Sequence, residues 1–328
     1  MKEKILHLLK ESEKSFISGQ GISGKLGVSR TAIWKYINIL KEDGYEIESV
    51  SKKGYRLISS PDLLSSEELS ENLHTKYIGQ NIMYFQTIDS TNNKAKELAL
   101  SGYPNGTIII SEEQTLGRGR LGRSFVSPKY KGIWLSIILR PDIDPMNVPK
   151  VTQVGAAAVI KTLKELDIKA YVKWPNDIVL NNKKICGILT EMSGELNKVN
   201  YVVMGIGINV NIDAEDFPEE LRDTATSISY EVGRYIKRKE LVSNLLNNFE
   251  ILYDEFEKKE SINTSVSICK ENSILIGNEV KIINRGKESI GKAVDLNNEG
   301  ELLVQYSDGR IEKIISGEVS IRGLYGYV

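Results

Sequence analysis

Two residue types that build many enzyme sites are scarce in this chain of 328 residues. It has two cysteines, Cys186 and Cys269, and two histidines, His7 and His74. Two cysteines exclude a disulfide framework and favour a cytoplasmic protein. So few cysteines and histidines leave no Cys/His cluster for zinc and no plausible Ser-His-Asp triad. An enzyme of this composition must rely on lysine, arginine, backbone amides and, where a metal takes part, Mg²⁺, as phosphoryl and nucleotidyl transfer do.

Long apolar runs are missing as well. No run reaches the roughly 18 residues that a membrane-spanning helix needs. The first 14 residues carry too many charges for a secretory signal. With 41% hydrophobic residues and a net charge of −1, the composition is that of a soluble globular protein without a membrane partner. The length predicts two or three domains.

Charge is distributed unevenly along the chain. Residues 1–60 contain eleven Lys/Arg and seven Asp/Glu, a net charge of +4. The remaining residues contain 32 Lys/Arg and 37 Asp/Glu, a net charge of −5. A small basic head on an acidic body indicates that the head binds a polyanion.

The first sixty residues have the pattern of a winged helix-turn-helix. Gly27 is placed to end one helix, and Ser29 is placed to cap the next. Apolar spacing predicts three helices followed by two short strands, at residues 1–11, 22–26, 30–43, 45–49 and 54–58. In such modules the start of the second helix of the motif enters the major groove of DNA.

Cations of this head, with one threonine, are the candidate DNA contacts. Arginine and threonine at the start of the reading helix suit base edges, and lysines of the wing suit phosphates. The predicted DNA-binding residues are Arg30, Thr31, Lys35, Lys52 and Lys53. Trp34 could be a core anchor or a DNA contact, and we expect it to lie in the core. The alternative is a helical cap that only mediates dimerisation.

Gly117–Arg123, with the sequence GRGRLGR, alternates glycines and arginines just after an apolar run. Glycine lets the backbone approach a ligand closely, and arginine supplies charged forks that suit phosphate and carboxylate. The spacing also satisfies the dinucleotide-binding pattern G-x-G-x-x-G, which requires a helix to open at the third glycine. Residues 132–139 instead predict a strand, which argues against that pattern. A solvated surface loop is the remaining alternative.

One further motif stands before this loop and others stand after it. They are Asp89-Ser90-Thr91-Asn92, Lys173-Trp174-Pro175-Asn176-Asp177, Lys184 in KKICGIL, Gly205-Ile206-Gly207-Ile208-Asn209, and the SGEVSIR stretch that ends at Arg322. With these motifs the chain resembles biotin–protein ligases. Together with its first sixty residues, it resembles the bifunctional kind, the biotin operon repressors, over nearly its whole length.

The resemblance implies a multidomain α+β protein. Residues 1–60 would form the winged helix-turn-helix, residues 61–270 a mixed-sheet α/β ligase domain, and residues 271–328 a small SH3-like β-barrel. In the central domain the sequence itself predicts two helices, at 90–100 and 155–166. It also predicts strands at 107–111, 132–139, 170–173, 178–180, 184–191 and 199–206.

The resemblance also implies an ATP-dependent, two-step reaction. Biotin and ATP would give biotinyl-5′-AMP, and a lysine of a biotin carboxyl carrier domain would then accept the biotin. Operator DNA would be the second partner, and a homodimer would form when biotinyl-AMP is bound. The alternatives are a non-enzymatic biotin-sensing transcription factor and a lipoate or octanoyl transferase on the same fold.

Roles for individual residues follow from the same resemblance. The biotin contacts would be Ser90, Thr91, Asn92, Gln114, Gly117, Arg118, Arg120 and Lys184. The ATP contacts would be Arg123, Phe125, Lys173, Asn176, Asp177, Asn209 and Arg322. Lys184, Arg120 and Arg118 are the expected catalytic residues, and Asp177 is the candidate Mg²⁺ ligand.

Structural roles are the alternative at several of these positions. Ser90 and Thr91 could simply cap a helix, and Asn209 could close a turn. One departure from the family concerns the tryptophan that relatives often carry after the last loop arginine, which packs on the adenylate. Ser124 and Phe125 stand there in this chain. Phenylalanine can stack on a purine but offers less area.

Overall fold

The computed structural model describes residues 1–328 except 13–14, 260, 285–286, 316–318 and 324–328. The chain divides into two compact units, Met1–Glu71 and Asn72–Val328, and each is described by itself. Among the described residues, no helix is long and apolar enough to cross a membrane.

The first unit contains the three expected helices, α1 (Lys2–Glu11), α2 (Gly19–Leu26) and α3 (Arg30–Glu42). Ser18 and Ser29 accept hydrogen bonds from the first turns of α2 and α3, and Gly27 takes the left-handed conformation between them (φ 66°). One side of each helix packs into a shared core of Ile5, Leu9, Ile22, Ile33, Ile37 and Leu40.

Two antiparallel strands, β1 (Glu46–Val50) and β2 (Gly54–Ser59), form the wing. The short helix α4 (Ser66–Leu69) follows and also packs with this unit, because its fully buried Glu68 accepts a hydrogen bond from Tyr45 and pairs with Lys10. Compact packing of the unit therefore continues to Glu71. The domain boundary after residue 60 stays a prediction.

The expectation that Trp34 lies in the core is wrong. Its side chain is 56% exposed, whereas Ile33 and Ile37 on the same helix are buried. The core side of α3 is set by residues 33, 37 and 40, and residue 34 stands about 100° away from residue 33 around the helix. The apolar character of tryptophan suggested burial, but its helical phase excludes it.

In the second unit, seven strands of the described residues form a mixed sheet in the order β3-β4-β5-β9-β8-β7-β6. Only β3 and β4 are parallel neighbours among them. The strands are β3 (Ile82–Phe85), β4 (Ile108–Ser111), β5 (Gly132–Leu139), β6 (Tyr171–Lys173), β7 (Asp177–Leu180), β8 (Lys183–Glu195) and β9 (Lys198–Asn209).

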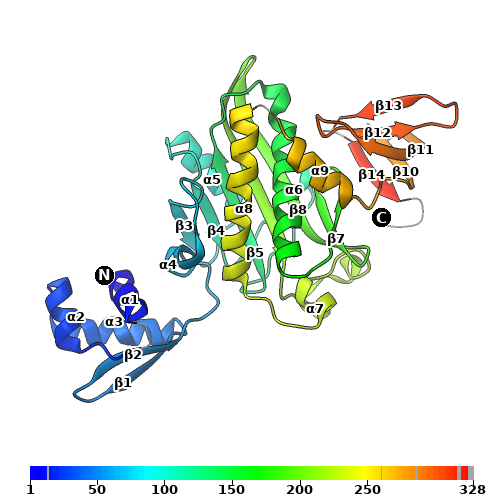
Figure 1. Cartoon of the computed structure of the whole chain (residues 1–328). Coiled ribbons are helices and arrows are strands. Elements are labelled where there is room, and N and C mark those ends of the chain that lie inside the picture. The colour runs from blue at the N-terminus through cyan, green and yellow to red at the C-terminus, as the bar shows by residue number, and fades with distance from the viewer. Residues whose placement is uncertain (13–14, 260, 285–286, 316–318, 324–328) are drawn as a thin grey trace. The chain divides into compact units, whose positions relative to one another are not determined.

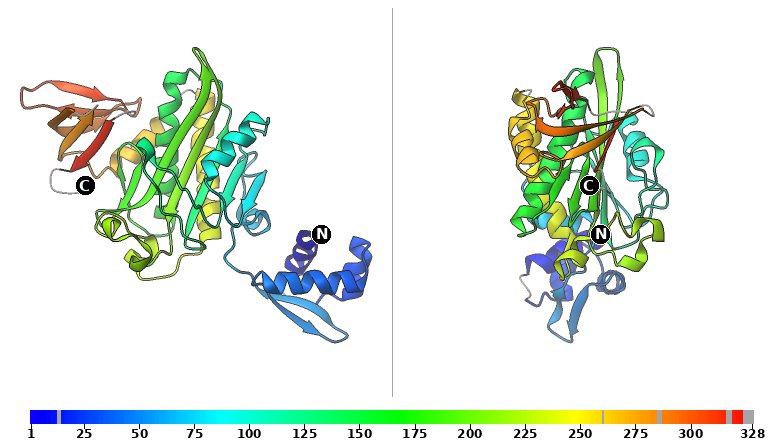
Figure 2. Two further views of the ribbon diagram at one scale, coloured as in Figure 1. Left: turned by 180° about the vertical axis from the view of Figure 1, so that it is seen from behind. Right: turned by 90° about the vertical axis from the view of Figure 1, so that its right-hand side faces the viewer.

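Helices cover both faces of this sheet. Helices α6 (Val148–Glu165) and α8 (Arg238–Lys259) lie side by side on one face, and α5 (Thr91–Leu100) packs against the other (Figures 1 and 2). On the α5 face, Ala95 and Leu98 pack in one apolar cluster with Ile138 of β5 and Val203 of β9. Successive residues of a strand point to opposite faces of the sheet, so every second residue of these strands faces α5. The other helices are α7 (Ile228–Val232) and α9 (Asn263–Glu271), with short 3₁₀ turns at Ser70–Asn72, Arg120–Gly122, Pro145–Asn147, Ala214–Asp216 and Glu219–Leu221.

The C-terminal strands form an antiparallel sheet in the order β13-β12-β11-β10-β14. They are β10 (Glu279–Asn284), β11 (Lys287–Leu296), β12 (Leu302–Gln305), β13 (Ile311–Ile314) and β14 (Val319–Gly323). The turn between β11 and β12 meets the central domain, where Trp174 Nε1 donates to the Gly300 carbonyl at 2.9 Å and Lys150 pairs with Glu299. This contact attaches the small sheet to the loop that precedes β7.

Candidate active site

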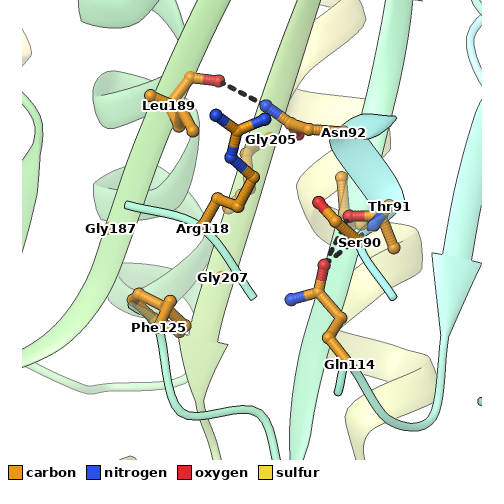
Figure 3. A pocket seen from close by; sticks show the side chains of 12 residues that line it. Ser90, Thr91, Asn92, Gln114, Arg118, Phe125, Gly187, Leu189, Gly205 and Gly207 are labelled. Atoms are coloured by element: carbon orange, nitrogen blue, oxygen red, sulfur yellow. Dashed lines mark hydrogen bonds between the residues drawn. The ribbon is translucent and has the colours of Figure 1, made fainter. Parts of the chain in front are cut away.

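A pocket opens on the α5 face of the central sheet, opposite α6 and α8. The start of α5, the glycine-arginine loop and strands β8 and β9 enclose it (Figure 3). It is lined by Ser90, Thr91, Asn92, Gln114, Arg118, Phe125, Leu135, Gly187, Leu189, Gly205, Ile206 and Gly207. Six of the predicted site residues therefore come together, three from residues 90–92 and three from residues 114–125.

Hydroxyls and amides at one end of this pocket form a connected network. The Thr91 backbone N–H and hydroxyl both donate to Gln114 Oε1, at 2.9 and 3.0 Å, and Gln114 Nε2 donates to Ser127 Oγ at 2.9 Å. The Ser136 hydroxyl lies 2.8 Å from Thr91 Oγ1 and 2.6 Å from Asn92 Oδ1. Because these groups hold one another, the polar end of the pocket is arranged before any ligand arrives.

The helix cap and the pocket use the same residues. Ser90 is buried and caps α5 by accepting from the Asn93 backbone N–H at 3.5 Å. Asn92, in the first turn, donates to Glu191 Oε2 at 2.8 Å, and Lys96 reaches the other oxygen of that carboxylate at 3.0 Å. Burial alone would raise the pKa of Glu191, but the hydrogen bonds from Asn92 and Lys96 outweigh it and lower that pKa. The capping alternative and the binding role are thus compatible.

Glycine is required where the sheet meets Asn92. A Cβ on Gly205 would overlap the Asn92 side-chain amide. A Cβ on Gly207 would come within 2.7 Å of the Phe125 ring, which also lies close to Gly187. The Phe125 ring meets Trp134 edge-on, with 5.8 Å between the ring centres. Small residues in β8 and β9 therefore leave the space that Phe125 fills at this side of the pocket.

The glycine-arginine loop folds back on itself. The Phe125 N–H donates to the Gly117 carbonyl at 2.8 Å, and the Gly119 N–H donates to the Arg123 carbonyl at 2.7 Å. A Cβ on Gly117 would overlap the Phe125 carbonyl, so this position needs glycine. The loop contains one short 3₁₀ turn and is followed by strand β5. The helix that a dinucleotide-binding loop would need after its third glycine is therefore replaced by a strand.

The three loop arginines differ in their surroundings. Arg118 is exposed at the pocket and donates to Asn93 Oδ1 at 3.1 Å, and Arg123 is exposed. Arg120 reaches inward and donates to Asn176 Oδ1 at 2.8 Å. Burial lowers the pKa of Arg120 and the charge of Arg123 adds to this, while Asp177 opposes both. Arg120 therefore links the loop to the KWPND segment.

Lys184 and Asp177 form an ion pair beside the pocket. The Lys184 ammonium lies 2.6 Å from Asp177 Oδ1 and 5.7 Å from the centre of the Phe125 ring. These two residues stand on the neighbouring strands β8 and β7. A cation and a carboxylate thus lie together near Phe125 at one side of the pocket, and Asn176 connects them to Arg120.

Other predicted ATP contacts lie outside the pocket lining. Asn176 also donates to the Ile188 carbonyl at 3.0 Å, and Lys173 is 5% exposed. Asn209 is 4% exposed and donates to the carbonyl of Thr226, a residue distant in the chain, at 3.0 Å. Arg322 stands on β14 opposite Lys281, and its side chain lies outside the described residues, as does the start of the SGEVSIR motif at residues 316–318.

Sequence reasoning missed two polar residues that organise the site. Ser136 is the one polar side chain in the apolar strand Gly132–Leu139, and its isolation was a usable signal. Glu191 lies at the exposed end of a long strand, and nothing in its local sequence distinguishes it. The predicted DNA contacts belong to the other unit, where they are all exposed: Arg30, Thr31, Lys35, Lys52 and Lys53.

Three known families match successive parts of this chain. Residues 2–56 match the HTH domain family, residues 84–209 the Biotin/lipoate A/B protein ligase family, and residues 275–322 the Biotin protein ligase C terminal domain family. The chain is also similar to the biotin protein ligase of Aquifex aeolicus solved with biotin and ATP, with 31% identity and a TM-score of 0.65. That match covers 74% of this chain and 99% of the ligase.

Full-length relatives match as well. The Bifunctional ligase/repressor BirA of Escherichia coli K12 is 30% identical, over 97% of this chain and 96% of its own. The protein of the same name from Bacillus subtilis 168 is 40% identical, over 98% of both chains. Matches of this identity and coverage extend across both units, and the chain therefore belongs to the BirA family of bifunctional ligase/repressors.

Proposed function

We propose that this protein joins biotin to ATP as biotinyl-5′-AMP and transfers the biotin to a specific lysine of a biotin carboxyl carrier domain. We propose further that it represses transcription by binding operator DNA in response to biotin. The names of the full-length relatives and the ligase solved with biotin and ATP support both activities. The observation that carries the ligase proposal is the contact chain from Arg120 through Asn176 to Asp177 and Lys184, next to a preformed polar pocket.

In the first step a biotin carboxylate oxygen attacks the α-phosphorus of ATP, and pyrophosphate leaves. A carboxylate and a triphosphate repel each other, so fixed cations are needed where they meet. Lys184 supplies an ammonium close to the pocket, and Arg118 and Arg120 supply guanidinium forks from the loop. None of these residues has to lose a proton in this step.

The head of biotin is a urea, with two N–H donors and one carbonyl acceptor. The network around Thr91, Gln114 and Ser136 offers hydroxyl and amide groups that both donate and accept. We therefore assign the ureido ring to this end of the pocket, and the carboxylate to the end near Lys184.

In the second step the amine of the carrier lysine attacks the acyl carbon, an amide forms, and AMP leaves. Until then the mixed anhydride must be kept from water. The loop Gly117–Arg123 is suited to cover it, because its glycines permit close approach and its arginines match the acyl phosphate.

Mg²⁺ is proposed to enter with ATP. Among the described residues, no three His, Cys, Asp or Glu side chains are grouped so that they could hold a metal ion. Magnesium is usually held by one or two carboxylates together with substrate phosphates, so Asp177 fits this mode. The metal would neutralise phosphate charge there.

The remaining proposals concern assembly and regulation. The exposed cations of the first unit would contact operator DNA, and binding of biotinyl-AMP would favour a homodimer. The dimer is tested by sedimentation of the full chain with and without biotin and ATP. Two buried free cysteines are compatible with a cytoplasmic protein.

Two other functions are distinguished by one assay. A pure biotin sensor would bind biotin without labelling a carrier, and a lipoate or octanoyl transferase would use a different acyl group. The full chain is incubated with ATP, Mg²⁺ and an unmodified biotin carboxyl carrier domain, together with biotin, lipoate or octanoate. Labelling with biotin alone supports the ligase. Absence of labelling in the presence of bound biotin favours the sensor, and labelling with lipoate or octanoate favours the transferase.

A further inference from the structure

Trp34 is the exposed tryptophan of a chain that has three. Its side chain is 56% exposed, whereas Trp134 and Trp174 are 0% and 1% exposed. A large aromatic side chain in water gives up the stabilisation that burial would provide. Nothing in the folding of the first unit explains this position, because the core side of α3 is already filled by Ile33, Ile37 and Leu40.

The position of Trp34 on α3 is specific. Arg30 lies one turn before it, and Lys41 lies two turns after it, so the three side chains share one flank of the helix. Lys41 donates to Ser49 of β1 at 3.2 Å. Arg30 lies near Gly19 and Tyr55: a Cβ on Gly19 would stand 3.8 Å from Arg30 Nε and 3.7 Å from the Tyr55 ring. This flank therefore faces the wing strands.

Cations accompany Trp34 on α3 and in the wing. Lys35 is exposed next to Trp34, and Lys53 and Arg56 of the wing lie over the Phe16 ring, at 5.8 and 4.7 Å from its centre, with Arg56 also paired with Glu48 of β1. On α3 itself the acidic residues Glu42 and Asp43 stand at the far end of the helix, and Asp43 is paired with Lys2. An aromatic side chain between cations, on the open side of a helix next to a wing, suits a nucleic acid groove rather than a protein surface.

We propose that Trp34 reads operator sequence directly, by packing its indole against the C5-methyl group of a thymine in the major groove. This proposal rests on the repressor function proposed above and names a residue that sets sequence specificity. The major-groove edge of an A·T pair is the one that carries a methyl group, and apolar side chains distinguish it by contact. The partner of Trp34 is therefore duplex DNA with an A·T pair at a fixed place in the half-site.

The experiment uses the full chain with biotin and ATP. Random-sequence duplexes are selected with the unaltered protein, and an enriched duplex is compared with a scrambled one. The proteins are the unaltered chain, Trp34→Ala, Trp34→Phe and, as a matched control, Ile39→Ala. Ile39 is exposed on the same helix but on a different flank.

Trp34→Ala is expected to weaken binding to the enriched duplex about tenfold and to leave the scrambled duplex unchanged. Trp34→Phe should retain part of the preference, and Ile39→Ala should retain all of it. Replacing thymines of the enriched duplex by uracil one at a time should weaken binding of the unaltered protein at a defined position. At that position Trp34→Ala should not distinguish the two bases.

A second measurement does not depend on how the variants fold. Because Trp134 and Trp174 are buried, acrylamide should quench mainly the Trp34 fluorescence of the unaltered chain, and the enriched duplex should protect it. The proposal is overturned if Trp34→Ala weakens both duplexes by the same factor. It is also overturned if no thymine-to-uracil change matters, or if Trp34 stays open to acrylamide in the complex. If selection with the unaltered protein enriches no sequence, the proposed repressor function itself fails. The selection step therefore distinguishes that failure from a failure of the Trp34 proposal.

Discussion

The Lys184 ammonium lies 2.6 Å from the Asp177 carboxylate, on neighbouring strands of the central sheet. The adjacent Lys183 is bound differently, because its ammonium donates to the Arg222 carbonyl at the surface. Two consecutive lysines therefore have distinct environments, one beside the pocket and one at the protein surface. The family resemblance names Lys184 and not Lys183, and the two environments give a physical difference between them.

Lys184→Ala should reduce biotin-dependent exchange of pyrophosphate into ATP by at least tenfold, and about 10²–10³-fold if its charge acts mainly in the transition state. The reason is that the variant removes a fixed cation from the place where a carboxylate meets a triphosphate. Lys183→Ala is the matched control and should exchange pyrophosphate at nearly the rate of the unaltered chain. Equal rates in both variants and the unaltered chain would show that Lys184 is not catalytic.

Arg120→Gly should increase the escape of biotinyl-AMP. Arg120 fastens the loop to the KWPND segment through its 2.8 Å hydrogen bond to Asn176, and glycine removes both the charge and the tether while adding loop entropy. Escaped anhydride would biotinylate lysines of serum albumin added to the reaction. The control is the unaltered enzyme at equal adenylate production, and no excess labelling of albumin would refute the covering role of Arg120.

The turn at Gly300 should support ATP binding from outside the pocket. Its carbonyl accepts from Trp174 Nε1, and its positive φ of 75° brings it so close to Gln153 that a Cβ would lie 2.9 Å from Cγ of that residue. Gly300→Ala should therefore raise the KM for ATP in pyrophosphate exchange more than the KM for biotin. Gly309→Ala is the control, because Gly309 has a similar φ of 85° and open space around it. Equal effects of the two changes would indicate backbone strain alone.

The sequence could predict elements wherever periodicity and caps agree. Strand Gly132–Leu139 is predicted from the sequence with its observed ends, because seven residues, all apolar except Ser136, follow a glycine. Helix α2 begins at Gly19, three residues before its predicted start, because the Ser18 cap outweighs the low helix propensity of three glycines. Helix α6 begins at Val148 rather than at residue 155, since Pro149 is compatible with a first helical turn.

What the sequence could not predict is pairing across long distances. Strand β5 pairs with β9, so that Ser136 stands opposite Gly205, about seventy residues later in the chain. That register brings Ser136 next to Thr91 and Asn92 and leaves space for Asn92 above Gly205. Motif resemblance named the pocket residues from α5 and the loop, but the residues that hold them in place come from the sheet.

Removing residues 1–71 should leave pyrophosphate exchange and carrier labelling nearly unchanged and abolish operator binding. The site residues that the structure brings together all lie after residue 89, and compact packing of the first unit ends at Glu71.

Removing only residues 1–60 is the informative comparison. That truncation deletes Lys10 and Tyr45, and so removes two partners of the fully buried Glu68 carboxylate. The shorter truncation should therefore keep its activity but bind more of a hydrophobic dye and aggregate at lower temperature. Loss of exchange in a folded chain lacking 1–71 would show that the first unit contributes to the active site. Equal solubility of the two truncations would show that residues 61–71 need no packing against the first unit.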